Sequence, residues 1–190
     1  MKKILFDGTN LDNWHTRNGS IPTWTIEDKA VTVTKDDIIS NEEFGDAFIH
    51  VEFREPDMPE AEGQAKGNSG VFIHGCYEIQ VLDSFGHEPP DQSDCSAVYN
   101  MYAPLVNACL PALEWQTYDI IFRAPVFNGD EMTEPARLTL LHNGRVVHNN
   151  IILYRATPGG LTDHPVARGQ LMLQDHWNKV SFRNIWIEEL

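Results

Sequence analysis

The sequence predicts an all-β domain, a two-sheet antiparallel sandwich of the jelly-roll type, and three observations lead to that prediction. Apolar and polar residues alternate at period two from one end of the chain to the other, which is the spacing of a strand. No long segment shows the helical period. Turn signals separate the alternating runs at short intervals, which is typical of sandwiches and barrels. Neither a repeat nor a shift in composition marks a boundary, so residues 1–190 are interpreted as one domain.

The expected strands follow this alternation in order along the chain. They cover residues 24–26, 31–33, 47–54, 71–74, 77–82, 118–122, 138–147, 170–176 and 182–187. Within the seventh of these, Asn143-Gly144 predicts a two-residue hairpin turn, because both residue types tolerate positive φ. Loops rich in Pro, Gly and acidic residues are expected over 55–66, 84–96, 124–135 and 155–168. Loops of this length on a rigid scaffold are often functional.

Charge and hydropathy exclude two classes of partner. Lys and Arg number 14 against 28 Asp and Glu, a formal net charge of −14, and no basic run interrupts the acidic background. Nucleic acid is therefore not an expected ligand. No apolar stretch approaches the roughly 20 residues that span a bilayer, so no membrane association is expected. The N-terminal apolar run is too short for a signal peptide, so the sequence as given predicts a cytoplasmic protein, and a trimmed chain would be secreted or periplasmic.

Three cysteines and one acidic loop contain the residue types that form disulfides or bind metals. Cys76, Cys95 and Cys109 are odd in number and lack zinc-site spacing, so reduced packing residues are expected. The acidic group His87, Asp91 and Asp94, with Asp83 beside it, offers oxygen and nitrogen ligands, but acidic loops are usually solvated. The sequence therefore predicts no metal site and no cofactor.

Unusual polar residues share one face of the predicted strands. In 77–83, Glu78 and Gln80 alternate with the apolar Tyr77, Ile79 and Val81. A carboxylate and an amide therefore point to the same side.

Two further strands repeat the pattern. In 169–176, Gln174 and His176 project together with Gln170 and Met172, and in 68–74 His74 has the parity to join the same face as Phe72. Each such residue alone is usually a solvated side chain, but the co-occurrence of Glu, Gln and His favours a site.

This combination of side chains is suited to a sugar. Histidine transfers protons near neutral pH, partial burial raises the pKa of a glutamate toward neutral pH, and amides bind hydroxyl groups. Tyr99, Tyr102, Trp115 and Trp177 could supply flat apolar surface for a ring, or could belong to the core. The residues thus indicate an enzyme that acts on a carbohydrate.

The chain resembles the 3-keto-disaccharide hydrolase domain family over nearly its whole length. The resemblance rests on Leu5-Phe6-Asp7-Gly8, Gly67-Asn68-Ser69-Gly70-Val71-Phe72, Tyr77-Glu78-Ile79-Gln80-Val81-Leu82-Asp83, Thr157-Pro158-Gly159-Gly160 and Leu173-Gln174-Asp175-His176, which occur in the family's order. It implies a concanavalin-A-like jelly roll with the ligand on the concave sheet face. It also implies cleavage of 3-keto-glycosides: the ketone acidifies the C2 proton, a base removes it, the aglycone leaves C1, and water adds afterwards without a nicotinamide.

The resemblance and the shared polar face together name the candidate site residues. Glu78 and His176 are expected to transfer protons, and which of them is the base stays open. The candidate substrate-binding residues are Asn68, His74, Gln80, Asp83, Tyr99 and Gln174. The chain departs from the family's pattern at His74, where an Arg is expected, at Gln116, where an Asn is usual, and at Trp177, where a Gly is common. The expected partner is a small-molecule carbohydrate.

Two other functions fit the same residues. A non-catalytic carbohydrate-binding module is one, since this fold hosts many lectins. A conventional endoglucanase is the other, because the strand beginning at Glu78 resembles the catalytic strand of jelly-roll glucanases. Gln80 stands where the helper Asp of those enzymes would be, and Glu78 and Asp83 share a face only if a β-bulge lies between them.

Overall fold

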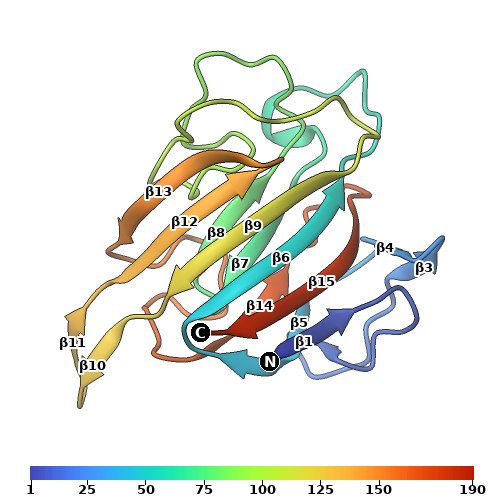
Figure 1. Ribbon diagram of the computed structural model, residues 1–190. Helices are drawn as coiled ribbons and strands as arrows, with labels where there is room; N and C mark the ends of the chain where they lie inside the picture. The colour runs from blue at the N-terminus through green and yellow to red at the C-terminus, as the bar shows by residue number, and fades with distance from the viewer.

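Two antiparallel sheets lie face to face in the computed structural model, which describes residues 1–190 (Figure 1). The larger sheet has the strand order β13-β12-β9-β6-β15-β4-β3, and β1 pairs with β15. Its strands are β1 (Lys2–Phe6), β3 (Thr25–Glu27), β4 (Ala30–Thr32), β6 (Ala47–Arg54), β9 (Gln116–Arg123), β12 (Ala136–His142), β13 (Arg145–Leu153) and β15 (Ser181–Glu189). The smaller sheet has the order β2-β5-β14-β7-β8, with β2 (Trp14–Thr16), β5 (Ile38–Phe44), β14 (Gly169–Leu173), β7 (Ser69–Ile73) and β8 (Tyr77–Val81). The predicted all-β sandwich is confirmed.

The core lies between the two sheets and follows the predicted alternation. In β6 every second residue from Ala47 to Phe53 is buried, and the intervening residues are partly exposed. In β7 and β8 every residue is buried, because their outer face is covered as well. The cysteines are free and buried, as expected. No helix of the molecule is both long and apolar enough for a membrane span.

The hairpin prediction is confirmed and one loop prediction is wrong. Asn143 and Gly144 both have positive φ, at 51° and 74°, and connect β12 to β13. Residues 124–135 were expected to be a loop, but β10 (Val126–Asn128) and β11 (Glu131–Glu134) form a hairpin that projects from the sandwich (Figure 1). Its strands are short and polar, so alternation with a buried face gives no signal there.

The remaining long loops position the site. Segment 82–115 and the short 3-10 helix η1 (Gly63–Ala65) lie together at one end of the sandwich, at the top of Figure 1. Backbone hydrogen bonds fasten this end to β8: Gln80 donates to the Ala97 carbonyl at 2.9 Å, and Ser96 donates to the Gln80 carbonyl at 2.9 Å. The loops therefore extend the edge of the smaller sheet beyond its last strand, β8.

Candidate functional site

A cavity of about 160 Å³ lies on the outer face of the smaller sheet, away from the main core. Its lining consists of Gln64, Asn68, Glu78, Gln80, Tyr99, Pro158, Gly159, Gln174 and His176. Six of the eight candidate residues named from the sequence therefore meet at one place. Gln64 was not predicted, because it lies in η1, where no strand periodicity marks the direction of a side chain.

The floor beside this cavity is apolar. Ile39, Phe72 and Met172 pack together as a cluster separate from the main core, with Leu161 over them. Strand register places them next to the polar residues, since Phe72 pairs with Glu78 and with Met172. Glu78 therefore sits at the border of an apolar surface and a polar one.

The carboxyl group of Glu78 is nearly inaccessible to water. The residue is 4% exposed, and its backbone N–H donates to Thr157 Oγ1 at 2.9 Å. Burial raises the pKa of Glu78 to about 8, and the nearby Asp37 carboxylate adds to the rise. At neutral pH Glu78 therefore carries a proton that it can give away.

The Gln80 side-chain amide connects Glu78 to the neighbouring amides. One end of the amide lies 3.0 Å from Glu78 Oε1, and the other lies 3.1 Å from Gln64 Oε1. A protonated Glu78 can donate to the amide oxygen, whereas an ionised Glu78 accepts from the amide nitrogen. A 180° rotation of the Gln80 amide therefore provides a hydrogen-bond partner for either protonation state of Glu78. The network continues to Asn68, whose Nδ2 donates to Gln64 Oε1 at 3.2 Å.

Gln174 brings an unsatisfied acceptor into the cavity. Its side-chain Oε1 is buried and has no hydrogen-bond partner. Its backbone is held on both sides, because Gln174 N–H donates to the Gly70 carbonyl at 3.0 Å and the Gln174 carbonyl accepts from Ser69 Oγ at 2.7 Å. Buried acceptors are normally paired, so this oxygen is available to a donor that arrives with a ligand.

His176 reaches the cavity from a fixed turn after β14. The Asp175 carboxylate accepts the N–H groups of Asp36 at 3.0 Å and Trp177 at 2.8 Å, and Asp175 N–H donates to Asp37 Oδ1 at 2.8 Å. The imidazole is partly exposed and stands edge-on to the Trp177 ring, with centroids 5.1 Å apart. The turn therefore fixes the approach of an imidazole to the same cavity as Glu78.

Arg17 holds the wall formed by the segment 157–160. Its Nη1 and Nη2 donate to the carbonyls of Gly160 at 3.0 Å and Gly159 at 2.6 Å, while Nε donates to Asp37 Oδ2 at 2.5 Å. One guanidinium thus ties the wall to the carboxylate that acts on Glu78. Sequence patterns did not indicate Arg17, because it is 142 residues from the segment that it binds.

His74 does not join the polar face, which corrects one prediction. Its φ of 53° breaks the strand alternation after Ile73, and the side chain turns into the core. There the ring packs edge-on against Phe44 and Phe122, and Nδ1 lies 3.1 Å from the Val166 carbonyl. Burial lowers the pKa of His74, which suits a neutral core histidine.

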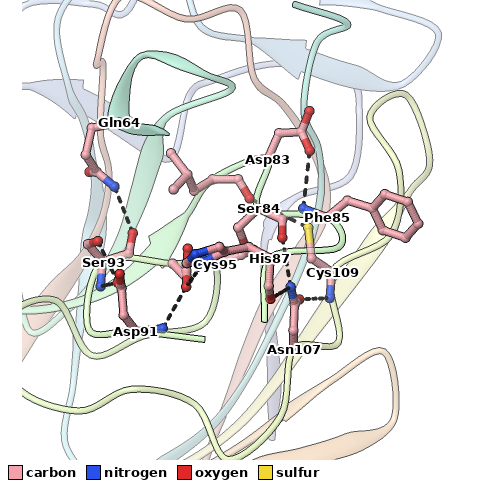
Figure 2. Close-up of polar contacts among 12 residues, drawn as sticks. Gln64, Asp83, Ser84, Phe85, His87, Asp91, Ser93, Cys95, Asn107 and Cys109 are labelled. Atoms are coloured by element: carbon pink, nitrogen blue, oxygen red, sulfur yellow. Dashed lines mark hydrogen bonds and ion pairs between the residues drawn. The ribbon is translucent and has the colours of Figure 1, made fainter. Parts of the chain in front are cut away.

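Asp83 does not line the Glu78 cavity either, which corrects a second prediction. It follows the end of β8 and pairs with Lys66 at 3.1 Å. It lines a separate cavity of about 430 Å³ together with Phe85, whose backbone N–H its Oδ1 accepts (Figure 2). Gln64 borders both cavities, and its Nε2 donates to the Ser93 carbonyl at 2.8 Å. Because no bulge brings Asp83 onto the face of Glu78, the two carboxyl groups do not form a pair.

Two clusters present three metal-ligand atoms within 4.8 Å of one another: His87 with Asp91 and Asp94, and Glu55 with Cys95 and Cys109. In the first, Asp94 Oδ2 already contacts His87 Nδ1 at 2.8 Å and accepts the Asp91 N–H at 2.7 Å. In the second, Glu55 accepts from Gln116 Nε2 at 2.6 Å, and burial raises the pKa of Glu55 well above its usual value. Hydrogen bonds within the protein therefore hold the side chains of both clusters.

Comparison with known proteins adds a family and a fold. The sequence profile described as the 3-keto-alpha-glucoside-1,2-lyase-like domain matches residues 2–188. A solved structure from Parabacteroides distasonis, described as a "putative glycosyl hydrolase", is 34% identical with a TM-score of 0.92, covering 100% of this chain and 84% of that one. A second from the same organism, with the same description, is 20% identical with a TM-score of 0.75, covering 100% and 94%.

A more distant structure shares the fold alone. The alginate lyase Aly36B, solved as a mutant with an alginate tetrasaccharide, is 9% identical with a TM-score of 0.55, covering 100% of this chain and 97% of that one. No curated protein sequence matches the chain.

Proposed function

The chain belongs to the family of 3-keto-alpha-glucoside-1,2-lyase-like domains, and on this premise we propose that it cleaves 3-keto-glycosides by removing the C2 proton and expelling the aglycone from C1. The observation that carries the proposal is the carboxyl group of Glu78, buried and protonated at neutral pH, in a cavity shared with His176 and four amide side chains. This set supplies an acid, a base and hydroxyl ligands together.

The general acid is Glu78. Departure of the aglycone from C1 leaves negative charge on the glycosidic oxygen, and an acid with a pKa of about 8 is still protonated where the enzyme would work. After transfer, the Glu78 carboxylate accepts from the Gln80 amide 3.0 Å away. The amide thus stabilises the state that the reaction creates.

The general base is His176. Among the residues that line the cavity, Glu78, Tyr99 and His176 are titratable, and with Glu78 protonated the imidazole is the group suited to accept the C2 proton. Removal of the C2 proton by the base leaves an enolate, with the negative charge on the ketone oxygen at C3. When that charge returns, the C3 ketone re-forms, the C1–C2 double bond forms, and the C1–O bond breaks as the glycosidic oxygen takes the proton of Glu78. Gln174 and Asn68 would hold the sugar's hydroxyl groups, and Gln174 Oε1 is the acceptor left free. Water then adds to the 1,2-double bond, which completes a net hydrolysis.

Glu78 is the only carboxyl group that lines the cavity. A conventional glycosidase places two carboxyl groups about 5 to 9 Å apart across the scissile bond, and Asp83 lies in the other cavity. The site therefore suits elimination better than a two-carboxylate hydrolysis.

The test is aglycone release from a chromogenic 3-keto-glucoside and from its unoxidised parent. We expect turnover of the keto compound only, and a loss of about 10²- to 10⁴-fold in kcat for Glu78→Gln and for His176→Gln. Glu134→Gln, an exposed carboxylate of β11, is the matched control and should leave the rate unchanged.

Isotope labelling reports the mechanism separately. In D₂O the keto-sugar product should carry deuterium at C2, because that proton is removed and then replaced. Turnover without label would contradict elimination, and binding of both sugars without turnover of either would instead indicate a carbohydrate-binding module.

A further inference from the structure

One aromatic side chain stands beside the cavity at a cost to the fold. Trp177 is 85% exposed, and its φ of 60° lies in the left-handed region, which a bulky residue rarely adopts. Exposure leaves its apolar ring in water, and the backbone conformation costs roughly 1 kcal/mol or more. Glycine would relieve both costs, so stability does not explain a tryptophan here.

The turn that carries Trp177 is fastened at both ends. Its own N–H donates to Asp175 Oδ1 at 2.8 Å, and the following residue, Asn178, accepts the Asn68 N–H at Oδ1 at 2.8 Å. Asn68 lines the cavity, and His176 stands edge-on to the indole ring with centroids 5.1 Å apart. The backbone of the turn is therefore held in place, and the exposed indole ring lies next to the imidazole of the proposed base.

The cavity is too small for a complete glycoside. Sites that enclose whole drug-sized ligands measure about 300 to 1,000 Å³, whereas this cavity measures about 160 Å³. The cavity has room for little more than one sugar ring, so the rest of the glycoside must lie outside. Trp177 offers a flat apolar surface there.

We infer that Trp177 is a specificity-determining residue whose indole stacks against an aglycone that is itself a flat or pyranose ring. This inference rests on the proposed function, because an aglycone exists only if the ligand is a glycoside. Stacking of rings with apolar faces is worth about 0.5 to 1.5 kcal/mol, which corresponds to a factor of roughly two to ten in affinity. Such a contact distinguishes ring aglycones from small ones.

The closing experiment compares two 3-keto-glucosides, one with a phenyl and one with a methyl aglycone, on the natural protein and on Trp177→Gly. We expect KM for the phenyl compound to rise about five- to tenfold and KM for the methyl compound to change less than about twofold. Glycine accepts the positive φ, so the variant should unfold at the same temperature or higher. Equal changes for both compounds, or no change for either, would overturn the inference.

Phe85 provides the comparator. It is 57% exposed and lines the second cavity, which Gln64 connects to the first. If Phe85→Ala loses the preference for the phenyl aglycone and Trp177→Gly keeps it, the aglycone lies in the second cavity. That result would contradict the proposed role of Trp177.

A binding measurement separates this inference from the proposed reaction. Phenyl glucoside and methyl glucoside, neither oxidised, are titrated while tryptophan emission is recorded. Only the phenyl compound should change the emission of the natural protein, and Trp177→Gly should abolish that change. If these emission changes are seen but no keto-glucoside is turned over, the proposed reaction is wrong and the stacking role of Trp177 is supported. If keto-glucosides are turned over without any preference for the phenyl aglycone, only the stacking role is wrong.

Discussion

Gly70 lies against the carboxyl group of Glu78, so closely that a Cβ at position 70 would come within 2.6 Å of Glu78 Oε1. The two residues are on adjacent strands, with Gly70 paired to Gln80 and Glu78 paired to Phe72. Because Gly70 has no side chain, the carboxyl group of the proposed acid can occupy the space beside it.

Gly70→Ala should displace the Glu78 carboxyl and lower kcat by about tenfold or more, since small misplacements of an acid are costly. Unfolding in denaturant should show a loss of about 1 to 3 kcal/mol from overpacking. In a Glu78→Ala background the same change should cost less, although contact with Phe72 remains. An equal cost in both backgrounds would show that Gly70 does not serve Glu78.

Glu78→Gln should stabilise the protein at neutral pH while lowering kcat by about 10²- to 10⁴-fold. The folded pKa of about 8 lies above the usual 4.5, so between these values the folded state holds a proton that the unfolded state releases. Stability therefore falls as pH rises through this window, and the penalty at pH 7 is about 3 kcal/mol. Glutamine removes that contribution. Denaturant midpoints measured at pH 5 and pH 7.5 test this prediction: between the two, the natural protein should lose more stability than the variant.

The pH dependence of kcat tests the direction of proton transfer. If Glu78 donates its proton, the rate falls as pH rises through about 8, because the acid ionises. A rate that instead climbs through that value would make Glu78 the base and reverse the assignment to His176. Stopped assays between pH 6 and 9.5, with saturating keto-glucoside, separate these outcomes.

Arg17→Met should loosen the cavity wall and leave the chemistry in place. The Gly159 and Gly160 carbonyls would lose their donors, so KM should rise several-fold. Asp37 would also lose its guanidinium partner, and its uncompensated charge should move the alkaline limb of the pH profile upward. Lys35→Met is the control, because Lys35 is an exposed cation two residues before Asp37 in the sequence. Unchanged KM and unchanged hydrogen exchange in 157–161 would remove Arg17 from the site.

Local periodicity was informative where a strand runs straight. The alternation of 77–82 predicted that Glu78 and Gln80 share a face, and both line the same cavity. The same rule failed at His74, because a positive φ at the strand end rotates the side chain into the core. It also missed β5, where Asn41, Glu42 and Glu43 interrupt the apolar pattern.

Period two and turn chemistry act within a few residues, so the sandwich class, the Asn143-Gly144 hairpin and the face on which Glu78 lies could all be predicted from the sequence. The folded chain was needed to show that Gln64, Arg17 and the segment 157–160 complete the site, that Asp83 belongs to another cavity, and that Glu78 is desolvated. Arg17 and the segment that it binds are more than a hundred residues apart, and no local pattern records which segments meet or which side chains they bury.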